Sequence, residues 1–417
     1  MSYLFECIEC GKHYLPGEAL YLCPACSAGQ KPMEPLRGLM RIVYDMEAIG
    51  RSFDPEAAAA RNGSTFARYM EIFPISSADS VPPLFGGATP LRPVPNLRRV
   101  LKHDGVWLKD DTVSSTASFK DRASALVVAV ARESGRDTVA TASTGNAATA
   151  LAGQAASAGL KTVIFVPRKA PPAKLAQIAV FGGMLVPVKG TYDEAFELSR
   201  AACDEFGWFN RNTALNPFTT EGKKSAALEI WEQMGRRSPD WVVVPTGDGV
   251  ILAGVEKGFS DLAKMGFVDR VPRLAVIQAE GCRPIVDAWE AGRGEILPEK
   301  KPRTIADSIS VGVPRAGRWV MQALARNGGA CAAVSDEEIL DAIALLGKTT
   351  GVFAEPAAAA GVAGLKKMIE AGTIKRDESV VALVTGSGLK DVAAAGRAVS
   401  IPKAIDPDLA SLKKLLS

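Results

Sequence analysis

Short apolar runs alternate along the chain with longer alanine-rich stretches in which apolar residues recur at helical spacing. The runs lie at residues 138–143, 161–167, 184–188, 241–247, 273–279 and 379–386. Each run is apolar at successive positions, which is typical of strands that are covered on both faces. Segments 146–159 and 192–207 are examples of the helical stretches. Alternating strands and helices predict mostly parallel sheets with right-handed crossovers.

A lysine stands at the start of one predicted helix, within the stretch SSTASFKDRASA at 114–125. Ser118 is the expected N-cap, and Asp121 follows three residues later, where a capping carboxylate belongs. Lys120 then lies in the first turn, where the helix dipole disfavours a cation. Two interpretations stay open at this point: an exposed ammonium group in water, or an amine that is held in a Schiff base.

Three of the predicted strands end in small polar residues. Residues 143–146 lead into a helix whose first amides would hold an anion such as a carboxylate. Residues 246–251 include two glycines that let backbone amides close around a phosphate, and residues 385–387 offer two hydroxyl groups. Ligands of such sheets bind at the carboxyl ends of the strands. The three turns and Lys120 therefore predict one phosphate-bearing cofactor held between two lobes.

Four of the seven cysteines form two ordered pairs near the N-terminus. They are Cys7, Cys10, Cys23 and Cys26, with two residues inside each pair and twelve between the pairs. This spacing predicts a tetrahedral four-thiolate site for zinc, with iron, disulfides or free thiols as the alternatives. Four ligands leave no open position, so the predicted role is structural. The isolated cysteines are expected in the core: Cys203, Cys282 and Cys331.

Composition and charge narrow the choice of function. The net charge is +3 over 417 residues, and no basic run is interleaved with aromatic residues, so nucleic acid is not an expected partner. We expect no secretory signal and no membrane span, which predicts a cytoplasmic protein. The two histidines, His13 and His103, lie far from any nucleophile motif. Acid–base chemistry is therefore expected from a lysine.

Taken together, the motifs resemble those of the fold-type II pyridoxal phosphate enzymes, the tryptophan synthase β family, and within it the threonine synthases. The matching stretches are GGATPL (86–91), WLKDDTVSSTASFKDRAS (107–124), STGNAA (143–148), KLAQIAVFGG (174–183), NPFTTEGKKSAALEI (216–230), VVPTGDGVILAGVEKGF (243–259), QAEGCRPI (278–285) and TGSGLKD (385–391). The cysteine module is also similar to that of some threonine synthases.

The resemblance implies an α/β fold of two three-layer αβα lobes with mostly parallel sheets, plus a small N-terminal zinc-ribbon-like module. We expect the module at residues 1–35, a larger cofactor-binding domain at 36–105 and 238–417, and a smaller α/β domain at 106–237. A homodimer is also implied.

The resemblance further implies a role for each motif. Lys120 would form the Schiff base with pyridoxal 5′-phosphate and, once released, would act as the general base. The other cofactor contacts would come from Asn146 at the pyridoxal 3′-oxygen, from Gly247, Asp248, Gly249, Val250 and Ile251 around the phosphate, and from Thr385 at the pyridine nitrogen. The carboxylate of an amino-acid substrate would be bound by Ser143, Thr144, Gly145 and Ala147.

The implied reaction converts O-phosphohomoserine to threonine and phosphate, but two features depart from the family pattern. The positions that usually offer asparagine, serine and arginine to the substrate's phosphate read Thr213, Ala214 and Thr219. A cation relocated to Arg211, Lys223 or Lys224 would compensate for the missing guanidinium. The second departure is Asp248, which the cofactor's phosphate would repel unless its side chain turns away.

Two other functions stay open at this point. A β-eliminating deaminase or β-replacing synthase would use the same cofactor on a substrate without a phosphate, and the changed phosphate-binding positions favour it. A non-catalytic regulator would keep the fold and use the zinc module for contacts with partners. The intact Lys120, Asn146 and Thr385 argue against the regulator.

Overall fold

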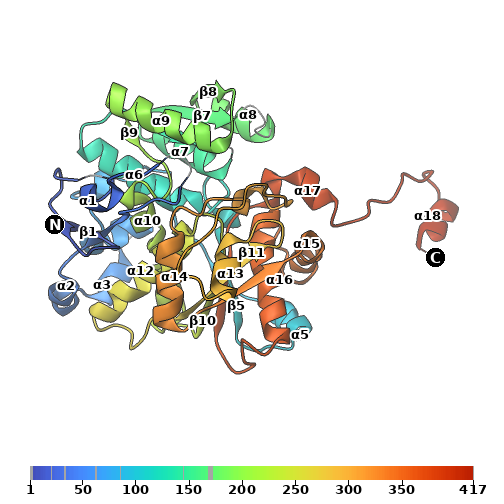
Figure 1. The fold of residues 1–417 in the computed structure, drawn as a ribbon. Helices are drawn as coiled ribbons and strands as arrows, with labels where there is room; N and C mark the ends of the chain where they lie inside the picture. Colours follow the sequence, from blue (N-terminus) through green and yellow to red (C-terminus); the bar gives the residue numbers. More distant parts are fainter. Residues whose placement is uncertain are drawn as a thin grey trace.

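Three β-sheets organise the chain in the computed structural model, which describes residues 3–19, 21–31, 34–61, 63–84, 86–143, 145–167 and 172–416 (Figure 1). The largest sheet has the strand order β12–β11–β10–β13–β5–β4. Its strands are β4 (Leu91–Pro93), β5 (Val106–Asp110), β10 (Trp241–Pro245), β11 (Arg273–Ala279), β12 (Ala330–Val334) and β13 (Val380–Val384). Its pairs are parallel apart from the edge pair β4–β5, which is antiparallel.

A second, four-stranded sheet is parallel and has the order β8–β7–β6–β9. Its strands are β6 (Thr138–Ala142), β7 (Lys161–Pro167), β8 (Met184–Val188) and β9 (Phe209–Asn210). All six apolar runs of the sequence form strands, as predicted: β6, β7, β8, β10, β11 and β13.

Helices cover both faces of the two larger sheets. In β10, Val242 and Val244 belong to the core under α12 (Val250–Lys264) and α14 (Gly317–Asn327), whereas Val243 belongs to the core under α15 (Asp336–Thr350) and α16 (Pro356–Glu370). In β7, Ile164 packs with α7 (Asn146–Ser157), and Val163 packs with α9 (Tyr192–Phe206). Each sheet is therefore the middle of an αβα sandwich, which confirms the predicted fold class.

The helices have the following bounds: α1 (Pro24–Ser27), α2 (Met46–Ser52), α3 (Pro55–Ala60), α4 (Thr65–Arg68), α5 (Pro95–Leu101), α6 (Lys120–Glu133), α7 (Asn146–Ser157), α8 (Pro172–Val180), α9 (Tyr192–Phe206), α10 (Pro217–Lys223), α11 (Ser225–Gln233), α12 (Val250–Lys264), α13 (Pro284–Glu290), α14 (Gly317–Asn327), α15 (Asp336–Thr350), α16 (Pro356–Glu370), α17 (Val392–Gly396) and α18 (Leu409–Leu416). Short 3₁₀ turns lie at η1 (Met70–Ile72), η2 (Ala78–Ser80), η3 (Asp111–Val113), η4 (Asp307–Ile309) and η5 (Gly388–Lys390).

Helix α6 begins at Lys120, but the predicted cap at Ser118 is wrong. The N-cap residue is Phe119, which makes no side-chain capping bond, and its N–H donates to the carbonyl of Thr385 at 2.9 Å. The Asp121 carboxylate accepts hydrogen bonds from the backbone N–H and the hydroxyl of Thr116 instead of capping the helix. A tertiary contact with the end of β13 thus replaces the local cap.

The third sheet is the antiparallel N-terminal sheet β2–β1–β3, with strands β1 (Leu4–Cys7), β2 (His13–Tyr14) and β3 (Met40–Val43). It packs on α10, where the rings of Phe5 and Phe218 lie 5.8 Å apart. Tyr44, directly after β3, donates to the Glu221 carboxylate at 2.8 Å.

Strand pairing shifts two of the expected domain limits. Strand β3 extends the N-terminal module beyond residue 35, and β5 joins the six-stranded sheet although 106 was the expected start of the smaller domain. The rest of the expected division into three domains stays a prediction.

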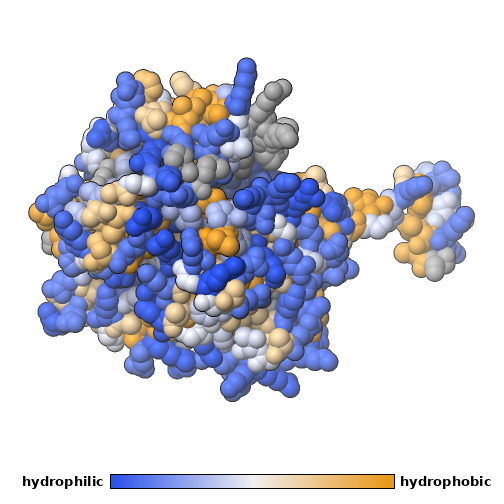
Figure 2. Space-filling model, in the orientation of Figure 1, coloured by the Kyte–Doolittle hydropathy of each residue, from blue (hydrophilic) through white to orange (hydrophobic). Residues whose placement is uncertain are grey.

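The C-terminal segment leaves the body of the molecule and ends in α18 (Figure 1). Its exposed apolar side chains, among them Ile401 and Leu409, form hydrophobic patches that Figure 2 shows on the projecting arm. Within the described part of the chain, no helix has the length and apolar character to cross a membrane.

Candidate active site

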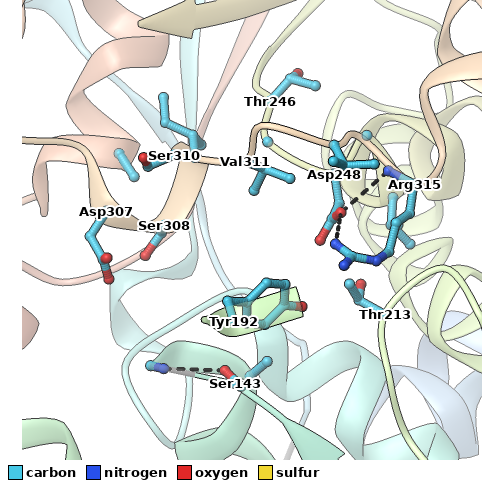
Figure 3. Close-up of a pocket in the computed structure, with 18 of the residues that line it drawn as sticks. Ser143, Tyr192, Thr213, Thr246, Asp248, Asp307, Ser308, Ser310, Val311 and Arg315 are labelled. Carbon is cyan, nitrogen blue, oxygen red and sulfur yellow. Dashed lines mark hydrogen bonds and ion pairs between the residues drawn. The ribbon is translucent and has the colours of Figure 1, made fainter. Parts of the chain in front are cut away.

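A cavity of about 730 Å³ lies where the carboxyl ends of β10 and β13 meet the first turns of α6, α7, α9 and α12. Figure 3 shows part of its wall, with Ser143, Tyr192 and Thr213 opposite the turn at Asp248. The following predicted site residues line this one cavity: Lys120, Ser143, Gly145, Asn146, Ala147, Gly247, Asp248, Gly249, Val250, Ile251 and Thr385. Thr144 lies outside the described residues. The structure thus brings together segments that are up to 265 positions apart (385 − 120).

Lys120 is the first residue of α6 and is half-buried at the cavity wall. Burial lowers the pKa of its amine; Glu355 opposes this shift, and Arg211 adds to it. A lysine with a lowered pKa more readily presents a neutral amine that can attack a carbonyl carbon. The segment is fixed by the Phe119–Thr385 hydrogen bond and by a bridge between Ser118 and Gly386. These backbone contacts fix the position of Lys120 relative to the end of β13.

The turn between β10 and α12 has room only for glycine at two positions. Gly249 has a φ of +87°, and a Cβ there would lie 2.6 Å from Cγ2 of Val320. A Cβ at Gly247 would lie 2.9 Å from Cγ2 of Val311. Helix α12 has no side-chain cap among the described residues, so its first N–H groups are available to an anion.

The carboxylate of Asp248 is paired with Arg315, which reduces its repulsion of an anion bound at the glycine turn. It accepts hydrogen bonds from the backbone N–H and from Nη1 of Arg315, both at 3.4 Å, as the dashed lines in Figure 3 mark. Arg315 also pairs with Asp193 at the start of α9, and its guanidinium lies 4.3 Å from the ring centre of Phe196. Arg315 thus links the glycine turn to α9, a connection that the sequence did not predict.

Asn146 begins α7 and donates from Nδ2 to both carboxylate oxygens of Glu355, at 2.8 and 2.9 Å. Its Oδ1 is buried without a hydrogen-bond partner among the described residues. Glu355 is buried, and its N–H donates to the carbonyl of Gly386. Glu355 directly precedes α16, in the stretch AEPAAAA (354–360), which carries no sequence signal of a polar site.

Two further cations line the cavity. The side chains of Arg211 and Lys223 are each 1% exposed, and Nη2 of Arg211 and Nζ of Lys223 have no hydrogen-bond partner in the described parts of the chain. Burial lowers the pKa of Arg211 to about 10 and the pKa of Lys223 far below its ordinary range.

Lys224 points elsewhere and is not part of the cavity wall. Its ammonium group donates to the carbonyl of Ile72 at 2.6 Å and pairs with Glu221 and Asp261. Of the three candidates for a relocated cation, Arg211 and Lys223 therefore meet the cavity, and Lys224 does not.

The three changed positions of the family's phosphate site differ in their surroundings. Thr213 lines the cavity, whereas the hydroxyl of Thr219 is buried and donates to the carbonyl of Asn216 at 2.7 Å. Ala214 adopts a left-handed backbone conformation with a φ of +63°. Thr219 therefore offers its hydroxyl to its own helix and not to a ligand.

The four N-terminal cysteines form a compact group. Their Sγ atoms all lie within 4.8 Å of one another, and those of Cys10 and Cys23 are 3.8 Å apart. Ligand sulfurs of a tetrahedral site with zinc–sulfur bonds of about 2.3 Å are separated by about 3.8 Å. The hydroxyl of Tyr14 lies 3.0 Å from the Cys23 sulfur. The donor set and its spacing fit a zinc ion.

Comparisons with known proteins agree with this geometry. The model of a family described as pyridoxal-phosphate dependent enzymes matches residues 83–386. The chain is 37% identical to the threonine synthase of Methanocaldococcus jannaschii over 414 residues, covering 99% of each chain. It is 36% identical to the threonine synthase of Halalkalibacterium halodurans, covering 82% of this chain and 93% of the relative. A solved threonine deaminase from T.th. superposes with a TM-score of 0.61 at 27% identity, covering 72% of this chain and 92% of that one.

Proposed function

Since the chain belongs to the family of pyridoxal-phosphate dependent enzymes, we propose that it is a carbon–oxygen lyase of the threonine synthase type. Its substrate would be a phosphorylated amino acid, O-phosphohomoserine, and its products threonine and phosphate. The observation that carries the proposal is a lysine of lowered pKa, Lys120, in one cavity with an uncapped helix N-terminus behind two sterically required glycines. The likeness to threonine synthases along the whole chain supports the choice of reaction.

The residues of the cavity fit the cofactor. The amides of residues 247–251 would hold its phosphate, and the pairing of Asp248 with Arg315 removes the expected repulsion. Asn146 would turn one of its two N–H groups to the 3′-oxygen while the other stays on Glu355. Thr385 would face the pyridine nitrogen as a neutral hydroxyl. The bound cofactor supplies an electron sink that eases the loss of protons next to the substrate's amino group.

The chain's own side chains supply the proton transfers and hold the substrate. Lys120 is poised as general base because burial favours its neutral form, and no histidine lines the cavity among the described residues. The N-terminus of α7, with Ser143, Gly145 and Ala147, would bind the substrate carboxylate through the helix dipole.

A second function is favoured by the changed phosphate-binding positions. With Ala214 and a Thr219 hydroxyl that is bound to its own helix, the chain could act on a substrate without a phosphate, as a β-eliminating deaminase or β-replacing synthase.

One experiment separates the two functions. The holoenzyme is incubated either with O-phosphohomoserine, with phosphate and threonine measured, or with serine or threonine, with the 2-oxo acid measured. We expect phosphate and threonine in equal amounts, and none with Lys120→Ala. Release of a 2-oxo acid without turnover of O-phosphohomoserine would replace the first function by the second.

We further propose that the cysteine module binds one structural zinc ion through Cys7, Cys10, Cys23 and Cys26. The separation of the sulfurs supports it, and four ligands leave no position for a substrate. Metal analysis of protein purified without chelator tests the site; iron in place of zinc, or no metal, would overturn it.

The active species is proposed to be a cytoplasmic homodimer. Free cysteines that are not paired in disulfides are typical of a reducing compartment, which supports the location. Apolar side chains on the projecting C-terminal arm support contact with a second chain, because isolated apolar patches in water are costly. Light scattering of the holoenzyme gives the mass; a monomer would contradict the proposal.

A further inference from the structure

Lys223 and Arg211 are the feature of the cavity that the cofactor does not explain. Buried cations are normally paired, because an unpaired charge in a poorly hydrated site is unstable. Here two of them face one cavity, each with a nitrogen that has no partner among the described residues. Nε of Arg211 donates to the hydroxyl of Ser124 at 3.2 Å. This bond fixes the guanidinium, whose Nη2 makes no hydrogen bond to the described residues. An anion bound in the cavity would give both nitrogens a partner.

Lys223 lies one helical turn from the position at which the family carries an arginine for the substrate's phosphate. Lys223 follows Thr219 by four residues on α10, and residues four apart lie on the same face one turn away. Thr219 is the position at which the resemblance predicts an arginine for the substrate's phosphate. The chain therefore lacks a cation at the first of these positions and carries one a turn later.

The glycine turn at 247–251 already offers several amides to one phosphate, so the cofactor's phosphate does not need these cations. We propose that Lys223 and Arg211 form a subsite for a phosphate monoester dianion, the distal phosphate of the substrate. The inference rests on the proposed function, because it assumes that the cofactor occupies the glycine turn.

The charges around Lys223 are consistent with a site that awaits an anion. Burial lowers the pKa of Lys223, Arg211 and Lys120 lower it further, and Asp248 partly offsets these effects. Asp248 is itself engaged by Arg315. A bound dianion would favour the protonated form of Lys223 and would give both cations a charge-assisted hydrogen bond, which is among the stronger interactions in proteins.

The test compares Lys223→Met with Lys223→Arg in the holoenzyme, with Lys264→Met as matched control. Lys264 is exposed at the end of α12, so its loss should change nothing. In Lys223→Met we expect the KM for O-phosphohomoserine and the inhibition constant of inorganic phosphate to rise about ten- to a hundredfold, with the cofactor absorbance unchanged. Lys223→Arg should recover most of both.

A stability measurement separates this role from a structural one. Without phosphate, Lys223→Met should melt at a higher temperature than the wild type, because the variant no longer buries an amine that lacks a hydrogen-bond partner. Inorganic phosphate should raise the melting temperature of the wild type and not of the variant. If Lys223 had a purely structural role, Lys223→Met would melt at a lower temperature than the wild type. Inorganic phosphate would then raise the melting temperatures of the wild type and the variant equally.

The outcomes also distinguish the inference from the proposed function. If the wild type does not turn over O-phosphohomoserine but phosphate protects it through Lys223, the subsite stands and the reaction is wrong. If the wild type is active and Lys223→Met has unaltered kinetics, the subsite is wrong. Weakened binding of pyridoxal phosphate alone in Lys223→Met would assign the cations to the cofactor and overturn the inference.

Discussion

The glycine turn before α12 gives the sharpest test of the proposed cofactor site. Replacing Gly249 by alanine places a Cβ 2.6 Å from Cγ2 of Val320, in a backbone conformation with φ of +87°. The left-handed conformation costs a residue with a Cβ roughly 1–2 kcal/mol. Overpacking in a well-packed core typically costs about 1–3 kcal/mol more. We therefore expect Gly249→Ala to lose roughly 2–5 kcal/mol of folding stability.

Gly266 provides a matched control at the other end of the same helix. Its φ is +79°, and a Cβ there would meet nothing within 4 Å. Gly266→Ala should therefore lose only the conformational part, roughly 1–2 kcal/mol. The difference between the two variants isolates the contact with Val320.

The functional readout is cofactor affinity. If Val320 pushes the turn outward and one amide loses its hydrogen bond to the phosphate, the loss of about 1.5–3 kcal/mol weakens pyridoxal phosphate binding roughly 10- to 150-fold. Titration of the apoenzyme by absorbance measures this, and urea unfolding measures stability. Wild-type affinity in a Gly249→Ala protein whose stability matches that of Gly266→Ala would refute the assignment of this turn.

Three further predictions follow from other parts of the structure. Lys120→Ala should abolish the visible absorbance of the cofactor and reduce activity by several orders of magnitude, whereas the exposed Lys264→Ala should do neither; a coloured, active Lys120→Ala protein would rule out its role. Cys10→Ser should release the metal, which metal analysis would show; unchanged metal content would refute the site. Because the N-terminal sheet packs on α10 through Phe5 and Phe218, loss of the metal should also raise the KM for O-phosphohomoserine without changing the cofactor spectrum. Burial lowers the pKa of Lys390 to about 8, so the unfolded chain binds more protons than the folded one between about pH 8 and 10. The free energy of unfolding should therefore rise with pH in this window. Urea unfolding at a series of pH values would measure it, and Lys390→Met should show a smaller rise than the wild type.

The six strands with β-branched, continuously apolar runs were predictable, whereas β5, which contains buried charges, was not. Strand β5 contains Lys109 and Asp110, which read as surface residues in the sequence. In the fold, Lys109 is fully buried because Glu229 of α11 pairs with it at 2.6 Å. The partner is 120 positions away (229 − 109), so no local pattern could predict the strand.

The motifs predicted which turns meet at the cavity, but not how single side chains are aimed. Lys223 and Lys224 are adjacent, yet successive residues of a helix point about 100° apart, and only Lys223 faces the cavity. Arg315 and Glu355 stand in stretches without a motif, and their roles arise from partners on other elements. The cap at Ser118 was mispredicted because Thr385 binds the next backbone N–H.

The place of β13 in the large sheet sets the order in which the protein can be built. This strand, Val380–Val384, lies between β10 and β5, so the centre of the sheet stays open until residue 384 has left the ribosome. Until then β5 has no parallel neighbour, and the segment before Lys120 lacks the carbonyl of Thr385. The smaller sheet, complete at residue 210, can form during synthesis, whereas the larger one closes only after residue 384 has been synthesised. A nascent chain stalled before residue 380 would therefore bring Lys120 out of the ribosome long before it could bind the cofactor.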